Sequence, residues 1–262
     1  MTNALLRVEN VTVRFGGIVA LDKFSLDVRS GSIQALIGPN GAGKSTMLNV
    51  ITGLYAIDGG TVLFERKRID GHAPHTISRL GIARTFQNTE LFGEMSAVEN
   101  VMVGLDRHYS YNLAIGMAHS PGYRRSEIAA RGEAQDLLAL VGLADDTAIA
   151  AAALPFGKQR RLEIARALAT RPKLLLLDEP AAGLRAAEVE SLNLILLNLR
   201  AEQGLTILVI DHVMALVMAV SDKISVLNFG RKIAEGEPDT VRRAPEVIRA
   251  YLGEKAAHAL GA

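Results

Sequence analysis

The sequence has no cysteine and no tryptophan, and aromatic residues of all kinds make up only 5% of it. Without cysteine the chain can form neither disulfides nor thiolate metal sites, which fits a reducing compartment and makes the cytoplasm the expected location. The sequence also lacks an excess of charge, since 29 basic and 28 acidic residues leave a net charge of +1. No overall basic field favours a nucleic-acid partner, so any anion site must be local.

Long hydrophobic runs are missing as well. Uncharged apolar stretches such as 148–156 and 205–210 are far shorter than the roughly 18 residues that span a bilayer. The first residues, MTNALLRVENVTVRF, have no basic stretch followed by an apolar core, so a secretory signal is not expected. We therefore expect a soluble chain that, at 262 residues, is long enough for one large α/β domain.

The hydrophobic pattern changes along the chain and predicts three kinds of region. In the first third, alternating stretches such as RVENVTVRF and FSLDV predict hairpin strands. From about Asn88 the period becomes helical, apart from a loose linker at 108–125. From Lys173 onward, short buried strands alternate with helical stretches, which is typical of parallel strands with crossover helices.

A glycine-rich segment, ALIGPNGAGKSTMLNVITG, follows an apolar strand and precedes a helical stretch. Gly38, Gly43, Lys44 and Ser45 match the pattern G-x-x-x-x-G-K-[ST] in the context that this motif requires. Free N–H groups at the helix start bind phosphate oxygens, Lys44 reaches the β and γ phosphates, and the Ser45 hydroxyl suits Mg²⁺. The residues expected to bind the nucleotide here are Gly38, Asn40, Gly41, Ala42, Gly43, Lys44, Ser45 and Thr46.

Two acidic residues end a later apolar run, LLLLDEP. Parallel sheets bind ligands at the carboxyl ends of their strands, where Asp178 and Glu179 are expected to lie. Asp178 can hold a metal through water, and Glu179 is placed to polarise an attacking water, which would make a nucleotide binder a hydrolase. The alternative is a solvated acidic pair that opens a loop.

In this order the motifs resemble the nucleotide-binding domains of ABC transporters, over nearly the whole chain. The resemblance implies an α/β fold with a P-loop NTPase (RecA-like) core, an N-terminal antiparallel β subdomain and an inserted α-helical subdomain. It divides a single domain, 1–262, into an ATP-binding core with the β subdomain, a helical subdomain with the signature loop, and a C-terminal tail. These parts are expected at 1–87 and 167–250, at 88–166, and at 251–262.

The same resemblance implies roles for three more residues. Gln87 in ARTFQN matches the glutamine that contacts Mg²⁺ and passes the nucleotide state to the membrane partner. His212, after the strand TILVI, matches the histidine that contacts the γ-phosphate, and Phe15 in VRFGG matches the aromatic residue that stacks on adenine. The catalytic set is then Glu179, His212 and Gln87, and the metal set is Ser45, Gln87 and Asp178. As alternatives, Phe15 is an ordinary core aromatic and Gln87 a surface amide.

The stretch LPFGKQRRLEIARAL occupies the place of the family's signature loop, usually Leu-Ser-Gly-Gly-Gln, which contacts an ATP held by a second subunit. Pro155 and Phe156 replace the serine and the first glycine, and Lys158 replaces the glutamine. A lysine in a first turn opposes the helix dipole, so we expect Gly157 and Lys158 to face the γ-phosphate of the partner's ATP. The alternative is an exposed lysine with no ligand.

Further residues of this region complete the interpretation. Arg160, Arg161 and Arg166 are expected on a solvated helix face, near Glu163. Arg185 stands in the family's D-loop, where an aspartate or asparagine is usual. These departures indicate that the residues that bind the chain's own ATP are complete, whereas the residues that would contact the partner's ATP are altered.

The insertion 91–143 and the ending VIRAYLG resemble the ATP-binding subunits of branched-chain amino acid importers. This resemblance implies ATP and Mg²⁺ as cofactors, a second ATP-binding subunit in a homo- or heterodimer, two membrane permeases and, indirectly, a periplasmic binding protein. The chain would then lie peripherally on the cytoplasmic face of the inner membrane, without a nucleic-acid partner. Alternatives are an importer of urea or amides, an ABC ATPase without transport, and a module that binds ATP without hydrolysing it.

Overall fold

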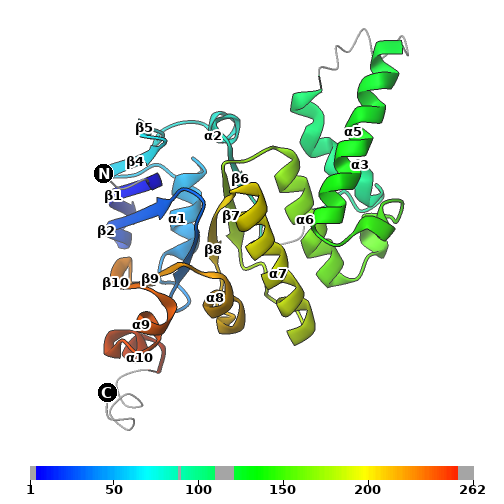
Figure 1. Cartoon of the computed structure of the whole chain (residues 1–262). Coiled ribbons are helices and arrows are strands. Elements are labelled where there is room, and N and C mark those ends of the chain that lie inside the picture. The colour runs from blue at the N-terminus through cyan, green and yellow to red at the C-terminus, as the bar shows by residue number, and fades with distance from the viewer. Residues whose placement is uncertain (1–3, 88–89, 110–120, 253–262) are drawn as a thin grey trace.

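The computed structural model of the chain describes residues 4–87, 90–109 and 121–252 (Figure 1). Two β-sheets form the core, and a lobe of helices stands beside it at the upper right of the view. No helix in the described ranges is both long enough and apolar enough to cross a membrane.

The first sheet is antiparallel and has the strand order β2-β1-β4-β5. Its strands are β1 (Ala4–Phe15), β2 (Ile18–Arg29), β4 (Gly59–Phe64) and β5 (Lys67–Arg68). The alternation along β1 buries Leu6, Val8, Val11 and Val13 on one face, as a half-buried strand requires. The predicted N-terminal antiparallel β subdomain is confirmed.

The second sheet is parallel except at one edge and has the order β10-β9-β3-β8-β7-β6. Its strands are β3 (Ile33–Ile37), β6 (Ile82–Arg84), β7 (Leu174–Asp178), β8 (Thr206–Ile210), β9 (Lys223–Asn228) and β10 (Arg231–Gly236). Strands β3, β7 and β8 are buried along their whole length, which explains why they read as continuous apolar runs. The carboxyl ends of β3 and β7 reach the same edge of this sheet, so their following loops meet there.

Two hydrophobic clusters cover the two faces of the parallel sheet. Along β7, Leu174 and Leu176 belong to the cluster shared with the antiparallel sheet, whereas Leu175 and Leu177 belong to the cluster shared with the helices on the other face. The helices of the core are α1 (Lys44–Ile51), α2 (Pro74–Leu80), α7 (Ala186–Gln203), α8 (Met214–Val220), α9 (Pro238–Arg242) and α10 (Pro245–Leu252). This layered α/β arrangement confirms the predicted fold class.

The helical lobe is built from α3 (Ala97–Leu105), α5 (Pro121–Leu140) and α6 (Phe156–Ala169). Helix α3 begins at a capping box, in which the Ser96 hydroxyl accepts a hydrogen bond from the Glu99 backbone N–H and the Glu99 carboxylate accepts one from the Ser96 backbone N–H. Helix α3 packs against both α5 and α6. The predicted inserted helical subdomain is confirmed.

Three expected boundaries fall inside helices of the structure. The expected linker at 108–125 overlaps the described part of α5, Pro121–Leu140. Residues 110–120 lie outside the described part. Helix α6 runs to Ala169, across the predicted division at 166. Helix α10 runs to Leu252, so the predicted tail at 251 starts inside a helix, and 253–262 lie outside the described residues.

Candidate active site

The loop between β3 and α1 depends on two glycines. Gly38 and Gly43 have φ angles of 154° and 109°, in the region that side chains rarely adopt. A Cβ atom at Gly43 would lie 2.5 Å from the Ala20 carbonyl oxygen, and one at Gly38 would lie 2.0 Å from the Leu227 carbonyl oxygen. The backbone can therefore follow this path only with glycine at both positions.

The Lys44 ammonium lies inside this loop. Lys44 is the first residue of α1, and its Nζ donates hydrogen bonds to the carbonyl oxygens of Gly38 at 2.8 Å and Pro39 at 3.0 Å. Burial lowers the pKa of Lys44, while Glu179 and Asp178 raise it through their charge. A largely buried ammonium that is bonded only to carbonyl dipoles favours an anion beside it.

The three residues expected to take part in catalysis form one cluster. Glu179 follows β7 with a φ of 50°, an unusual backbone conformation of the kind found at functional sites. Its Oε2 accepts a hydrogen bond from Gln87 Nε2 at 3.0 Å, and its Oε1 lies 3.9 Å from His212 Nδ1. Gln87 is thus exposed, as the surface-amide alternative has it, but its amide is directed at the carboxylate.

An open pocket of about 880 Å³ joins this cluster to the P-loop. Its lining includes Gln87, Glu179, His212 and all the expected phosphate-binding residues except Ala42. Ala42 is buried, but its backbone carbonyl accepts a hydrogen bond from Gly230, which belongs to the wall of the same pocket.

The pocket has two aromatic wall residues that the sequence did not indicate, Phe229 and Tyr251. Phe229 follows β9 and is 84% exposed. Tyr251 lies in the expected tail, yet α10 is anchored by Val247, which is 7% exposed, and carries Tyr251 one turn further on. Burial raises the pKa of Tyr251, and a hydrogen bond to the Gly38 backbone lowers it. The helical spacing of Val247 and Tyr251 was the available signal for this wall.

Phe15 ends β1 beside this pocket but is not among its lining residues. The ring is 46% exposed and makes an edge contact with Tyr55, with ring centres 5.2 Å apart. The alternative of an ordinary core aromatic is therefore wrong. The next strand begins with Ile18 and Val19, which do line the pocket, so stacking on adenine stays a prediction.

The donor set at the pocket fits a metal that arrives with a nucleotide. Within residues 4–87, 90–109 and 121–252, no cluster of three or more His, Asp or Glu side chains could hold a metal ion by itself. Mg²⁺ is usually bound by one or two carboxylates together with substrate phosphates. The exposed Ser45 hydroxyl and the Gln87 amide line the pocket and belong to such a partial set. Asp178, expected as the third member, is buried directly before Glu179 and is not among the lining residues.

The signature region differs from the expectation for Lys158. Its Nζ donates to both carboxylate oxygens of Asp146 at 2.8 Å, and the Asp146 side chain is only 10% exposed. Next to it, a Cβ atom on Gly157 would lie 2.3 Å from Oε1 of Glu188 in α7. In this structure the negative groups at the start of α6 are therefore the chain's own carboxylates, because the fold brings 146 and 188 to this helix end.

The expectation of a solvated arginine face is wrong for Arg160, which is 7% exposed. Its guanidinium donates to the carbonyl oxygens of Phe86 at 3.2 Å and Gln87 at 2.6 Å, and pairs with Glu163 at 3.2 Å. Burial raises the pKa of Glu163, and Arg160 counteracts that rise. Helix α6 thereby anchors the segment that carries Gln87, a tertiary contact without a local sequence signal.

Replacing Lys158 with glutamine tests the Asp146 pair. We expect Lys158→Gln to lower the free energy of unfolding by about 1 kcal/mol, because the buried Asp146 carboxylate loses its counter-charge. The loss is no larger because the Lys158 side chain is partly exposed, so that water weakens the ion pair in the wild type. Urea denaturation measures the change. The exposed Arg249→Gln change on α10 is the control and should leave stability within about 0.5 kcal/mol. Unchanged stability of Lys158→Gln would contradict the pair.

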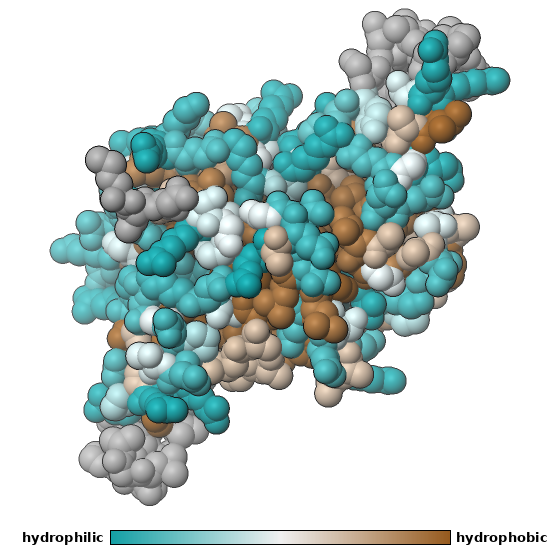
Figure 2. Space-filling view, in the orientation of Figure 1, coloured by the Kyte–Doolittle hydropathy of each residue, from teal (hydrophilic) through white to brown (hydrophobic). Residues whose placement is uncertain are grey.

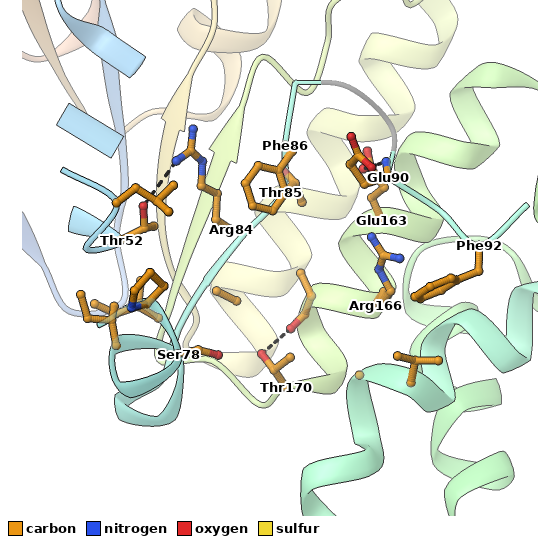
Figure 3. A pocket seen from close by; sticks show the side chains of 18 residues that line it. Thr52, Ser78, Arg84, Thr85, Phe86, Glu90, Phe92, Glu163, Arg166 and Thr170 are labelled. Atoms are coloured by element: carbon orange, nitrogen blue, oxygen red, sulfur yellow. Dashed lines mark hydrogen bonds between the residues drawn. The ribbon is translucent and has the colours of Figure 1, made fainter. Parts of the chain in front are cut away.

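A second pocket, of about 520 Å³, separates the core from the helical lobe (Figure 3). Thr52, Ser78 and Arg84 line it from the core, and Phe92, Glu163 and Arg166 line it from the other side. The Arg166 guanidinium stacks over the Phe92 ring at 5.7 Å, so this arginine is half-buried rather than solvated. Elsewhere, hydrophobic residues gather at the surface beside the helical lobe and over α7 (Figure 2). Leu194 of α7 is 59% exposed.

Comparison with known proteins agrees with these observations. A family model described as ABC transporter matches residues 21–182, and one described as branched-chain amino acid ATP-binding cassette transporter matches residues 231–257. The chain is 45% identical to the high-affinity branched-chain amino acid transport ATP-binding protein BraF of Pseudomonas aeruginosa and 42% identical to LivG of Escherichia coli. Each alignment covers 97% of this chain and 100% of the relative.

Solved structures resemble most of the chain. A nucleotide-free ATP-binding cassette from an ABC transporter superposes with a TM-score of 0.83 at 34% identity, covering 96% of this chain and 100% of that one. The ADP conformation of the cassette MJ1267 gives 0.82 at 34% identity, covering 97% and 100%. A dimeric bacterial ABC transporter cassette, MJ0796, gives 0.74 at 27% identity, covering 89% and 98%.

Proposed function

The chain belongs to the ATP-binding cassettes of ABC transporters, and we propose that it hydrolyses MgATP to drive uptake of branched-chain amino acids through separate membrane permeases. The observation that carries the hydrolytic part is the cluster of Gln87, Glu179 and His212 in one pocket with the P-loop. The substrate class is supported by the relatives that match the chain over nearly its full length.

In this proposal each residue of the pocket has a separate task. The P-loop amides and Lys44 bind the phosphates, and Ser45, Gln87 and Asp178 hold Mg²⁺, which neutralises phosphate charge when bound. Glu179 accepts the proton of the attacking water, and His212 contacts the γ-phosphate. Their closeness to one another supports these roles, since a general base must lie within reach of the water that it activates.

A second cassette is the proposed partner across the pocket, in a homo- or heterodimer. Dimeric cassettes among the solved relatives support this arrangement. Pro155, Lys158 and Arg185 would then alter what the chain offers to the partner's ATP, while its own phosphate-binding groups are complete. The Lys158→Gln variant, assembled into the dimer, tests this by the turnover of the ATP that the partner subunit holds. If that turnover is the same before and after the change, the altered contribution is contradicted.

The second pocket, which lies between the core and the helical lobe and is called the groove from here on, is the proposed contact for a permease. It contains Phe86 and Thr85, the residues directly before Gln87, so an element seated there touches the segment that reaches Glu179. Its wall combines exposed aromatic rings with the charged groups Glu90 and Arg166, which suits a short polar-tipped protein segment. The chain would then be peripheral on the cytoplasmic face of the inner membrane.

Purification from membranes through a tag on this chain tests the proposal. We expect two permeases and a second cassette to co-purify, and the reconstituted complex to take up leucine when ATP and a periplasmic binding protein are supplied. Uptake of urea or amides instead of leucine would change the substrate class. Co-purification of ribosomes or DNA ends, without permeases, would overturn transport. The same complex with Glu179→Gln is the control and should show no uptake.

A further inference from the structure

Arg84, at the end of β6, holds one of the two carboxylates of the hydrolysis site. Its Nη2 lies 2.8 Å from Oδ2 of Asp178, and the side chains are only 9% and 6% exposed. Strand β6 pairs with β7 in parallel, with Arg84 opposite Leu176, so the guanidinium reaches along the neighbouring strand to its last residue. The contact joins residues 94 positions apart.

The guanidinium is itself fixed from a third element. Its Nη1 donates to Oδ1 of Asn49 in α1 at 2.7 Å, so one planar group bridges the helix that begins at the P-loop and the strand that ends at Asp178. An arginine fork that is bound at both arms restricts the orientation of the carboxylate it contacts. Asp178 therefore presents its remaining oxygen in a defined direction.

The same side chain forms part of the wall of the groove in Figure 3. Its guanidinium carbon lies 5.2 Å from the centre of the Phe86 ring, which is 46% exposed. Its Nε is buried and has no hydrogen-bond partner in the described part of the chain. Arg84 thus has the groove on one side and the Asp178 carboxylate on the other.

We propose that Arg84 is a positioning residue that orients Asp178 for the metal and connects the metal site to the groove. Three residues later, Gln87 contacts Glu179, so segment 84–87 touches both Asp178, the last residue of β7, and Glu179, the next residue. A displacement of this segment by an occupant of the groove moves the metal carboxylate and the general base together. The statement that a protein segment occupies the groove depends on the function proposed above. The statement that Arg84 orients Asp178 does not depend on it.

The test measures how strongly Mg²⁺ improves nucleotide binding to the purified full-length chain. The dissociation constant of a fluorescent ADP analogue is compared in Mg²⁺ and in EDTA for wild type, Arg84→Gln and Arg84→Lys. We expect the improvement by Mg²⁺ to fall about 10-fold in Arg84→Gln, as for other residues that orient metal ligands. Affinity in EDTA should stay within about twofold, because Arg84 does not line the nucleotide pocket. Arg84→Lys should fall in between, since it keeps the charge and loses the fork.

The matched control is Arg171→Gln, which removes another arginine–carboxylate pair, with Glu133 at 2.9 Å, outside the pocket. It should leave the Mg²⁺ effect unchanged. If Arg84→Gln does not fold, Arg84→Lys decides the question by itself. An unchanged Mg²⁺ effect with a lowered melting temperature would reduce Arg84 to a structural role and overturn the proposal. A larger Mg²⁺ effect would also overturn it, because Arg84 would then compete with the metal. Neither result depends on which substrate is transported.

Discussion

A Glu179→Gln variant is expected to bind MgATP with near wild-type affinity and to hydrolyse it at least about 100-fold more slowly. Glutamine keeps the shape of the side chain, and its carbonyl can still accept the hydrogen bond from Gln87. It cannot accept a proton from the attacking water. Binding of a fluorescent ATP analogue and release of phosphate, measured on the same preparation, separate the two effects.

The control for this variant is Glu190→Gln on the exposed side of α7, which should hydrolyse ATP like the wild type. Hydrolysis by Glu179→Gln at more than about a tenth of the wild-type rate would place the general base elsewhere. A wild-type chain that is inactive even with its partners present would instead favour a module that binds ATP without hydrolysing it.

A Lys44→Met variant is expected to lose about 10- to 100-fold in nucleotide affinity, since hydrogen bonds between charged groups contribute more than neutral ones. Its stability without nucleotide should be unchanged or higher. Burial lowers the pKa of Lys44, so the unfolded chain holds that proton more tightly than the folded one. The charged ammonium therefore destabilises the folded state below the unfolded pKa of the lysine, and methionine removes that cost. Thermal unfolding with and without ADP measures both effects.

Lys173→Met is the matched control for this prediction. Lys173 is exposed, pairs with Glu65 at 2.7 Å and does not line the nucleotide pocket. The variant should keep the rise in melting temperature that ADP produces in the wild type, whereas Lys44→Met should lose most of it. A strong loss of stability in Lys44→Met without nucleotide would contradict the argument, and would mean that its bonds to the Gly38 and Pro39 carbonyls outweigh the cost of burial.

Much of the fold and of the phosphate site was predictable because the patterns that specify them are local. Alternation in β1 and continuous apolar runs in β3, β7 and β8 follow from the side-chain period of a strand and from the burial of one face or both. The P-loop glycines and the acidic pair at the end of β7 lie at or next to strand ends, where a parallel sheet gathers its loops. The expected linker at 108–125 and the expected tail from 251 were less accurate, since α5 and α10 extend into them.

The phosphate-binding loop, the two carboxylates and the layered α/β fold could be predicted from the amino-acid sequence alone, because each is specified by neighbours within a few residues. The partners of the charged groups were visible only in the folded chain: Asp146 for Lys158, the carbonyls of Phe86 and Gln87 for Arg160, and Asp178 for Arg84. A charged side chain near a helix end or strand end has several possible partners in the sequence. Which partner it contacts depends on how distant elements pack. Once the pair is buried, separating it would leave an unpaired buried charge, and that free-energy cost keeps the two groups together.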